Sequence, residues 1–163
     1  MTRFSVFQTL LLLLVIVGFF WLWIRVGDLE QESSSESLPE VHVLMSEMQT
    51  HLHKLSFSVL EENEALTHFY LHELEEVIGD LSDNELTYEG YKISQLTRQM
   101  LQPAFSELDR AAEQGEWEQI QGRLNSLVQT CNSCHMATDH GEIVIRGRAE
   151  QNPFNQDFSA PTD

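Results

Sequence analysis

The feature that most constrains this chain is a Cys-x-x-Cys-His run, Cys131-Asn132-Ser133-Cys134-His135, which contains both of its cysteines. On a helical turn, residues three apart lie on one face, so the two sulfur atoms point the same way. Each thiol is then placed to form a thioether with a vinyl group of haem, and the His135 imidazole lies beneath the iron. We therefore expect one covalent haem c, attached through Cys131 and Cys134 and ligated by His135.

Three other interpretations of this run remain open at the level of sequence. A zinc site would normally need a second, separated ligand pair, although His135 and His140 could complete one with the two cysteines. A thioredoxin-like redox pair needs a βαβ setting, which the pattern of the chain does not suggest. A disulfide between residues three apart is strained and closes almost no loop.

The charge of the chain is strongly unbalanced. Its formal net charge is −17, and no acidic residue precedes Asp28. Residues 28–163 contain 26 acidic and seven basic side chains, which gives −19. Such a surface repels nucleic acid, so we expect no nucleic-acid partner, and it favours a partner protein with a basic surface through long-range attraction. A purely solubilising role for the acidic residues stays open.

An apolar run of 21 residues, Phe4–Ile24, lies near the N-terminus and is long enough to cross a bilayer as a helix. Trp21 and Trp23 stand at its far end, where indole rings favour the membrane interface. No small-x-small cleavage site follows, so an uncleaved single-pass anchor is expected rather than a signal peptide. Because bacteria attach haem covalently outside the cytoplasmic membrane, the motif predicts a periplasmic domain on the inner membrane.

Four later stretches carry apolar residues at steps of three and four, the period of an amphipathic helix. The predicted helices cover residues 41–60, 64–78, 91–114 and 116–141, with Gly79 and Gly115 as stops and a possible kink at Pro103. Short connections between them predict an all-α, antiparallel four-helix bundle. The expected organisation is a transmembrane anchor at 1–27, an acidic Ser-rich linker at 28–37, the haem-binding bundle at 38–141 and a C-terminal tail at 142–163, held if at all by Phe154 and Phe158.

An exported four-helix bundle with this motif in the last turns of its fourth helix resembles the cytochrome c-prime group, including its low-spin relatives. The resemblance covers roughly residues 38–141. More narrowly, the chain is similar to a subgroup of membrane-anchored bacterial monohaem proteins through the runs MSEMQTHLHKLSF, HGEIVIR and PFNQDF. The resemblance implies His135 as one axial ligand. It implies on the other face either a methionine from the first helix or an apolar residue that leaves the iron open to small gases.

Helix geometry favours one methionine of the first predicted helix as the sixth ligand. His135 lies six residues before Gly141 and Met45 lies six residues after Pro39, so in an antiparallel pair the two stand at about the same height. Met45 is therefore the predicted sixth ligand, and Met48, one turn deeper on the same stripe, is the alternative. Either methionine could equally be core filler.

The other histidines offer further candidates. His68 and His72 are four residues apart on the second predicted helix, a spacing that can hold a metal, or they belong to a polar face. His72 could instead reach the haem. His51 is a candidate second histidine ligand, with His53 following it, and His140 could cover the ring edge or cap the fourth helix.

These observations predict a membrane-anchored monohaem c-type cytochrome that carries single electrons and is not an enzyme. A five-coordinate protein that binds nitric oxide or carbon monoxide is the first alternative. A haem subunit of a larger membrane complex is the second, and pairing of two bundles through helix faces is open.

Overall fold

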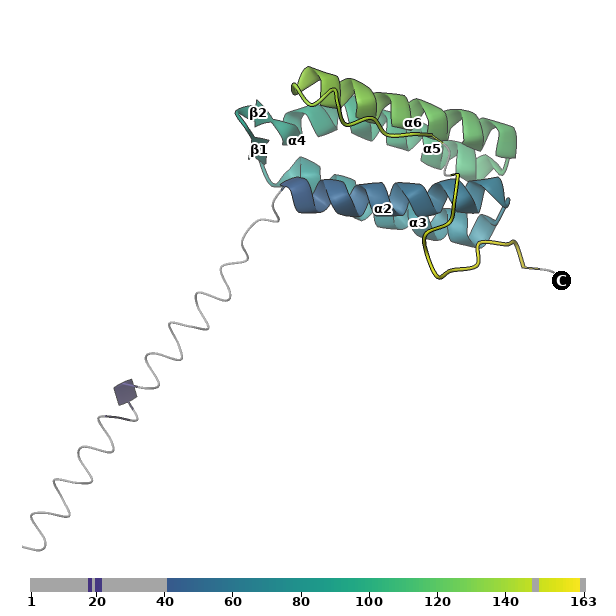
Figure 1. The fold of residues 1–163 in the computed structure, drawn as a ribbon, viewed down its shortest axis with the longest axis horizontal. Helices are drawn as coiled ribbons and strands as arrows, with labels where there is room; N and C mark the ends of the chain where they lie inside the picture. Colours follow the sequence, from purple (N-terminus) through teal and green to yellow (C-terminus); the bar gives the residue numbers. More distant parts are fainter. Residues whose placement is uncertain (1–17, 19, 22–40, 148–149, 162–163) are drawn as a thin grey trace, which may run out of the picture. The chain divides into compact units, whose positions relative to one another are not determined.

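The computed structural model describes residues 18, 20–21, 41–147 and 150–161 (Figure 1). Of the predicted membrane helix Phe4–Ile24, only Gly18, Phe20 and Trp21 are described, and they are helical. The rest of that segment, the predicted linker and residues 38–40 lie outside the described residues. Within the described part of the chain, no helix has the length and apolar character needed to span a bilayer. The compact unit that contains the motif spans Pro39–Asp163.

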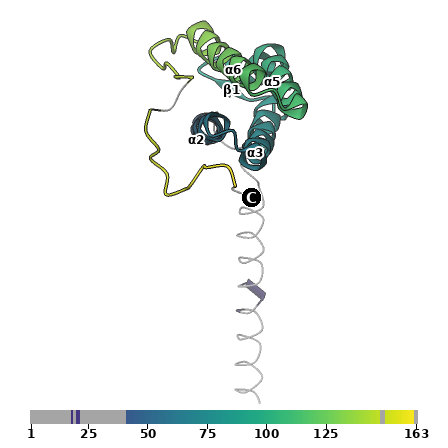
Figure 2. The ribbon, with the colours of Figure 1, turned by 90° about the vertical axis from the view of Figure 1, so that its right-hand side faces the viewer.

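This unit is all-α, and its four helices pack antiparallel, as the periodicity predicted. The first two are α2 (Val41–Leu60) and α3 (Glu64–Asp83), and the fourth is α6 (Trp117–Ala137). The third is continuous but has three parts: α4 (Ile93–Leu96), the π-helical turn η1 (Thr97–Leu101) and α5 (Gln102–Gln114). In Figures 1 and 2, α2 and α3 form one layer and α5 and α6 the other. The core between the layers includes the fully buried Leu55, Leu81, Leu108 and Leu124.

The start of α3 also anchors the C-terminal tail. Asn63 is the N-cap, and its side-chain oxygen accepts a hydrogen bond from the Leu66 amide at 3.1 Å. Its side-chain nitrogen donates to the carbonyls of Phe158 and Ser159, at 3.2 and 2.8 Å. Phe158 is buried in the core and Phe154 is partly buried against it. One asparagine therefore begins a helix and holds a segment more than 90 residues away.

Replacing this asparagine should separate its two roles. Asn63→Ala removes the cap and the tail contacts, and we expect it to lower the free energy of unfolding by about 1–2 kcal/mol. Asn63→Asp keeps the capping oxygen and removes only the donor, so it should expose the Phe158 segment with a smaller loss. Urea unfolding together with amide hydrogen exchange of residues 156–159 measures both effects. Equal exchange in the wild type and in Asn63→Asp would contradict the assignment.

The second predicted helix was placed too short. α3 continues through Gly79 to Asp83, because the buried stripe of Leu74, Val77, Ile78 and Leu81 continues past the glycine. A glycine inside a helix costs only about 1 kcal/mol, which this burial offsets. The apolar pattern of the second predicted helix places Phe69 on the same inward face as Tyr70, but Phe69 is 51% exposed, whereas Tyr70 is buried.

A small hairpin replaces much of the loop predicted at 80–90. Strands β1 (Thr87–Tyr88) and β2 (Tyr91–Lys92) pair antiparallel, with Tyr88 opposite Tyr91. The two turn residues, Glu89 and Gly90, both have positive φ, as a tight two-residue hairpin requires. The third helix therefore begins at Ile93 and not at Tyr91, as the periodicity had suggested.

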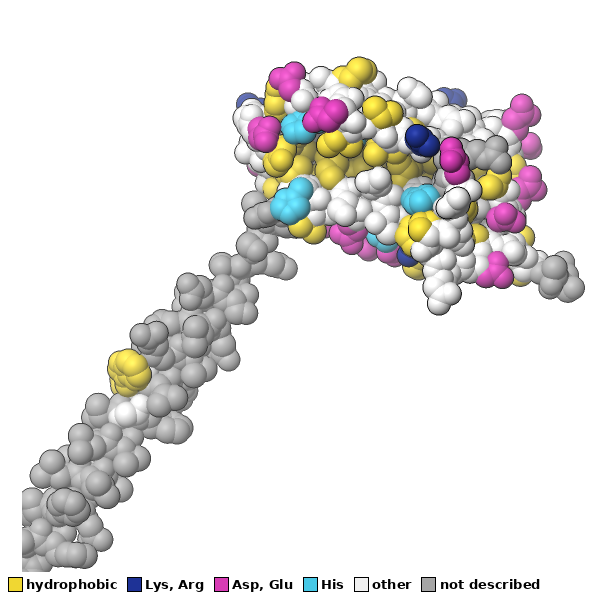
Figure 3. All heavy atoms as spheres, in the orientation of Figure 1, with side chains coloured by type: hydrophobic (Ala, Val, Ile, Leu, Met, Phe, Trp, Pro, Cys, Tyr) yellow, Lys and Arg dark blue, Asp and Glu magenta, His cyan; other side chains and the backbone are white. Residues whose placement is uncertain are grey.

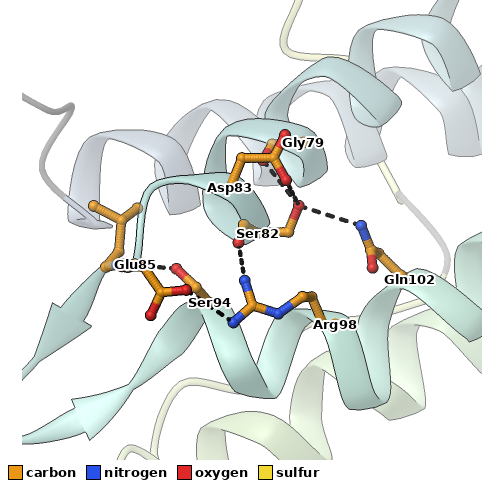
Figure 4. Close-up of polar contacts among 8 residues, drawn as sticks. Gly79, Ser82, Asp83, Glu85, Ser94, Arg98 and Gln102 are labelled. Carbon is orange, nitrogen blue, oxygen red and sulfur yellow. Dashed lines mark hydrogen bonds and ion pairs between the residues drawn. The ribbon is translucent and has the colours of Figure 1, made fainter.

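A wide π-helical turn, η1, precedes Pro103, the residue at which the sequence predicted a kink. In η1 the Gln102 amide donates to the carbonyl of Thr97, five residues back. Figure 4 shows Arg98 and Gln102 reaching from this turn to the end of α3. Arg98 donates to the Ser82 carbonyl and to Glu85 Oε1, the latter at 3.3 Å, and Gln102 donates to Ser82 Oγ at 3.2 Å. These bonds fix the third helix against α3.

α6 ends at Ala137, four residues before the predicted stop at Gly141. The Thr138 amide and hydroxyl both bond the carbonyls of Cys134 and His135, and Asp139 then adopts a left-handed conformation with φ of 60°. This turn sends the chain back along α6. The segment 142–147 has neither helix nor strand.

Candidate haem-attachment site

The three motif side chains lie on the last two turns of α6 and face one cavity. Cys131, Cys134 and His135 are each partly buried and line the same space of about 320 Å³. That volume is at the lower end of the range typical of cofactor and ligand pockets. The remaining wall is mostly apolar and comes from α2, the third helix and the segment after α6, with Tyr88 added by the hairpin. It includes Val41, Met45, Met48, Leu52, Ile93, Thr97, Leu101, Thr138, Ile143 and Ile145. Figure 3 shows apolar side chains gathered in the band between α2 and α6.

Both candidate methionines lie on the α2 wall of this cavity. Met48 is 6% exposed and belongs to the core, whereas Met45 is only partly buried. Steps of three and four residues place Met45, Met48 and then Leu52 on the side of α2 that faces α6. The structure thus places both methionines on the same cavity as the Cys-x-x-Cys-His motif.

The His135 ring is held in one tautomer by the backbone. Its Nδ1 lies 2.8 Å from the carbonyl oxygen of Ile143. A carbonyl can only accept a hydrogen bond, so Nδ1 carries the proton and Nε2 of the neutral ring keeps a free lone pair. A lone pair on Nε2 is what ligation of a metal requires, and a carbonyl bond on the other nitrogen is its usual accompaniment.

The segment Gly141–Gly147, here called the strap, is bonded back to α6 one turn before His135. Asn132 Nδ2 donates to the Ile145 carbonyl at 2.9 Å, and the Ile145 amide donates to Asn132 Oδ1 at 2.7 Å. Closer to the helix, the His140 amide donates to the His135 carbonyl and the Ile143 amide to the His140 carbonyl. The strap therefore closes one side of the cavity.

Both cysteines are free thiols in the described structure. Burial, with a smaller contribution from Cys134, raises the pKa of Cys131 to about 11, and burial also raises the pKa of Cys134. Reactive Cys-x-x-Cys pairs of the thioredoxin type have a lowered thiol pKa and a βαβ setting. Neither condition is met by this all-α unit.

The zinc interpretation receives no support from the described residues. No group of three or more His, Cys, Asp or Glu side chains among them is arranged to hold a metal ion. His140, its proposed fourth ligand, lines the cavity but is engaged elsewhere. Its Nδ1 lies 2.5 Å from the Thr138 carbonyl, its Nε2 lies 3.7 Å from Glu89, and its ring packs near Tyr88.

The remaining histidine candidates lie away from the cavity. His51 faces α3, with its Nε2 3.9 Å from Glu73 and its ring beside Tyr70. His53 stacks on Phe57 and meets the edge of Phe154 from the tail. His68 is exposed, and the exposed His72 lies beside Glu75 and Glu76 at 4.0 and 3.5 Å. Neither His51, the candidate second histidine ligand, nor His72, the candidate haem contact, is among the residues that line the cavity.

Several cavity residues carried no recognised signal in the sequence. His42 lies on the α2 wall one turn before Met45, and Tyr88 comes from the hairpin. Asn132 does not line the cavity but binds the strap beside it, and the sequence pattern marks it only as a spacer of the motif. For the strap, the alternation of Ile143 and Ile145 was the one feature of the sequence that indicated packing against the helices.

No family model matches the chain, and neither a curated protein nor a solved structure does.

Proposed function

We propose that this chain is a monohaem c-type cytochrome that carries single electrons, with haem c bound through Cys131 and Cys134. The observation that carries the proposal is the meeting of both thiols, a tautomer-fixed His135 and two methionine sulfurs on one apolar cavity. Thiols and a neutral imidazole are the donor set that covalent haem requires. The residues present therefore fit the group.

The bound haem would supply a one-electron couple, and the protein's part is binding, orientation and exclusion of water. Cys131 and Cys134 would hold the porphyrin edge, and His135 Nε2 would ligate iron. Met45 would ligate from α2, with Met48 as the alternative. Apolar walls keep water away, and a His/Met ligand pair favours a potential suited to electron transfer.

The proposed setting is the periplasmic face of a bacterial inner membrane, with Phe4–Ile24 as the anchor. Near the motif, Met136, Ile143 and Val144 are 65%, 46% and 66% exposed. Together with the strongly acidic composition, this supports docking of a partner that has basic groups around an apolar contact. A place within a larger membrane complex would use the same surface.

The spin state of the purified protein and its affinity for carbon monoxide test the proposal. After export with the haem-attachment machinery, the polypeptide should gain the mass of one haem and keep its colour when denatured. A closed, low-spin haem with slow carbon monoxide binding is expected. A high-spin ferric spectrum with rapid, tight binding would replace the carrier with the gas-binding alternative. A polypeptide of unmodified mass would overturn both.

Replacement of Met45 should identify the sixth ligand. Met45→Leu conserves volume but removes the sulfur, so we expect a high-spin ferric haem that binds carbon monoxide and a reduction potential lowered by on the order of 0.1 V. Met48→Leu is the matched control and should leave the low-spin spectrum in place. Spectroelectrochemistry measures both variants. If only Met48→Leu changes the spectrum, Met48 is the ligand.

A further inference from the structure

The strap is held at the site almost entirely by hydrogen bonds. Ile143 and Val144 are exposed, and the strap has no helix or strand of its own. Of its apolar residues, Ile145 is the one that packs partly against the core. Burial therefore does little to fix the Ile143 carbonyl, which is the group that holds His135.

The side chain of Asn132 holds the strap in place instead. Its side chain donates to the Ile145 carbonyl and accepts from the Ile145 amide, at 2.9 and 2.7 Å, so both polar groups of one residue are bound. Two opposed hydrogen bonds to one residue fix its position much as a neighbouring strand would. Asn132 and His135 are three residues apart on α6, so the strap meets two adjacent side chains of the same helix face.

A second close approach keeps the strap on α6. A Cβ at Gly147 would lie 2.6 Å from Asn125 Oδ1, which shows how tightly the backbone passes there. Asn125 precedes Asn132 by seven residues, or about two helical turns. The strap thus follows α6 from the motif back toward its middle.

We propose that Asn132 is a positioning residue for the iron ligand: by clamping Ile145 it holds the Ile143 carbonyl against His135 Nδ1. This inference rests on the proposed function and adds to it a residue that tunes the potential. A carbonyl that accepts the Nδ1 proton makes Nε2 a stronger donor, and a stronger donor stabilises oxidised iron. Asn132 therefore keeps the reduction potential lower than an unsupported His135 would.

Asparagine is well suited to this position because the clamp needs a donor and an acceptor on one short side chain. Asn132→Ala removes both bonds. Asn132→Asp keeps an acceptor for the Ile145 amide and loses the donor to its carbonyl. The matched control is Ser133→Ala, because Ser133 is the other spacer of the motif and its hydroxyl bonds only Gln129 of its own helix in the described structure.

The test is carried out on the full-length holoprotein, with reduction potential and hydrogen exchange as readouts. In Asn132→Ala the Ile145 amide and the His135 Nδ1 proton should exchange about tenfold faster. The ratio of reduced to oxidised protein at a fixed potential should rise roughly tenfold, or about 59 mV for one electron. Asn132→Asp should fall between wild type and Asn132→Ala, and Ser133→Ala should match wild type.

Two results would contradict the role of Asn132. Faster Ile145 exchange with an unchanged potential and an unchanged His135 proton would overturn the proposal, as would an effect of Ser133→Ala equal to that of Asn132→Ala. If Asn132→Ala fails to mature, Asn132→Asp carries the same comparison. If the wild type proves to hold no haem, the proposed function fails separately. The Ile145 exchange and the His135 tautomer, measured by nitrogen NMR on the haem-free chain, still report whether Asn132 holds the strap and the ring.

Discussion

Replacing both cysteines, Cys131→Ser and Cys134→Ser, is expected to abolish covalent haem completely. A serine hydroxyl is close in size to a thiol but does not form a thioether with a vinyl group. The exported polypeptide should then have the mass of its amino acids alone and lose its colour on denaturation. Mass spectrometry and a haem-stained denaturing gel measure the effect. Because both side chains are only partly buried, the helical circular dichroism should remain.

The single variants refine this expectation. Cys131→Ser and Cys134→Ser alone each leave one thiol, so a lower yield of singly attached haem is expected from each. Ser133→Ala, between the two cysteines, should retain full attachment. Covalent haem in the double variant would mean that attachment uses another residue, and the assignment of this cavity would then be withdrawn.

Leu124→Ala should cause the largest loss of stability of the variants considered. Leu124 is fully buried on α6, seven residues before Cys131, and packs where α6 meets the core. Truncation leaves a cavity and should lower the free energy of unfolding by about 2–5 kcal/mol. Since domains of this size are stable by about 5–15 kcal/mol, a substantial share of the stability is at stake.

The control is Leu60→Ala at the end of α2, where the side chain is 44% exposed. It removes the same atoms but forms little cavity, so we expect a loss below about 1 kcal/mol. Urea denaturation followed by circular dichroism compares the two. Equal midpoints for the two variants would mean that the α6 side chain does not pack as described.

Most of the fold could be predicted from the sequence because helical burial leaves a regular pattern. The stripes of α2 and α6 predicted both helices closely, and Gly115 ended the third helix with a positive φ of 72°. The prediction that Gly79 ends the second helix is wrong. A glycine ends a helix only where the chain needs a left-handed residue, and here continued burial of Leu81 outweighed its low propensity.

Part of the candidate site could likewise be predicted from the sequence, and part of it could not. The motif is a local pattern and Met45 follows from antiparallel height, so both could be placed before the structure was known. The hydrogen bond that His135 donates to the Ile143 carbonyl depends on how a segment without secondary structure turns back after Asp139, and no periodicity in the sequence predicts that turn. The role of Asn132 depends on that turn as well, since its partner is 13 residues further along the chain.

The wide turn η1 has a consequence for how such a cavity can change shape. Ile93, Thr97 and Leu101 follow one another at steps of four along the cavity wall. In an α-helix, a step of four residues rotates about 40° past a full turn. In the wider π-turn, a step of four residues rotates less than a full turn, so the two deviations compensate and Leu101 lies beneath Ile93. Loss of one residue between Thr97 and Leu101 would convert η1 into an α-helical turn, and Ile93 and Leu101, then seven residues apart, would stand about 20° short of two full turns. A single-residue deletion there would therefore shorten this wall of the cavity while Ile93 and Leu101 stay on nearly the same face of the helix.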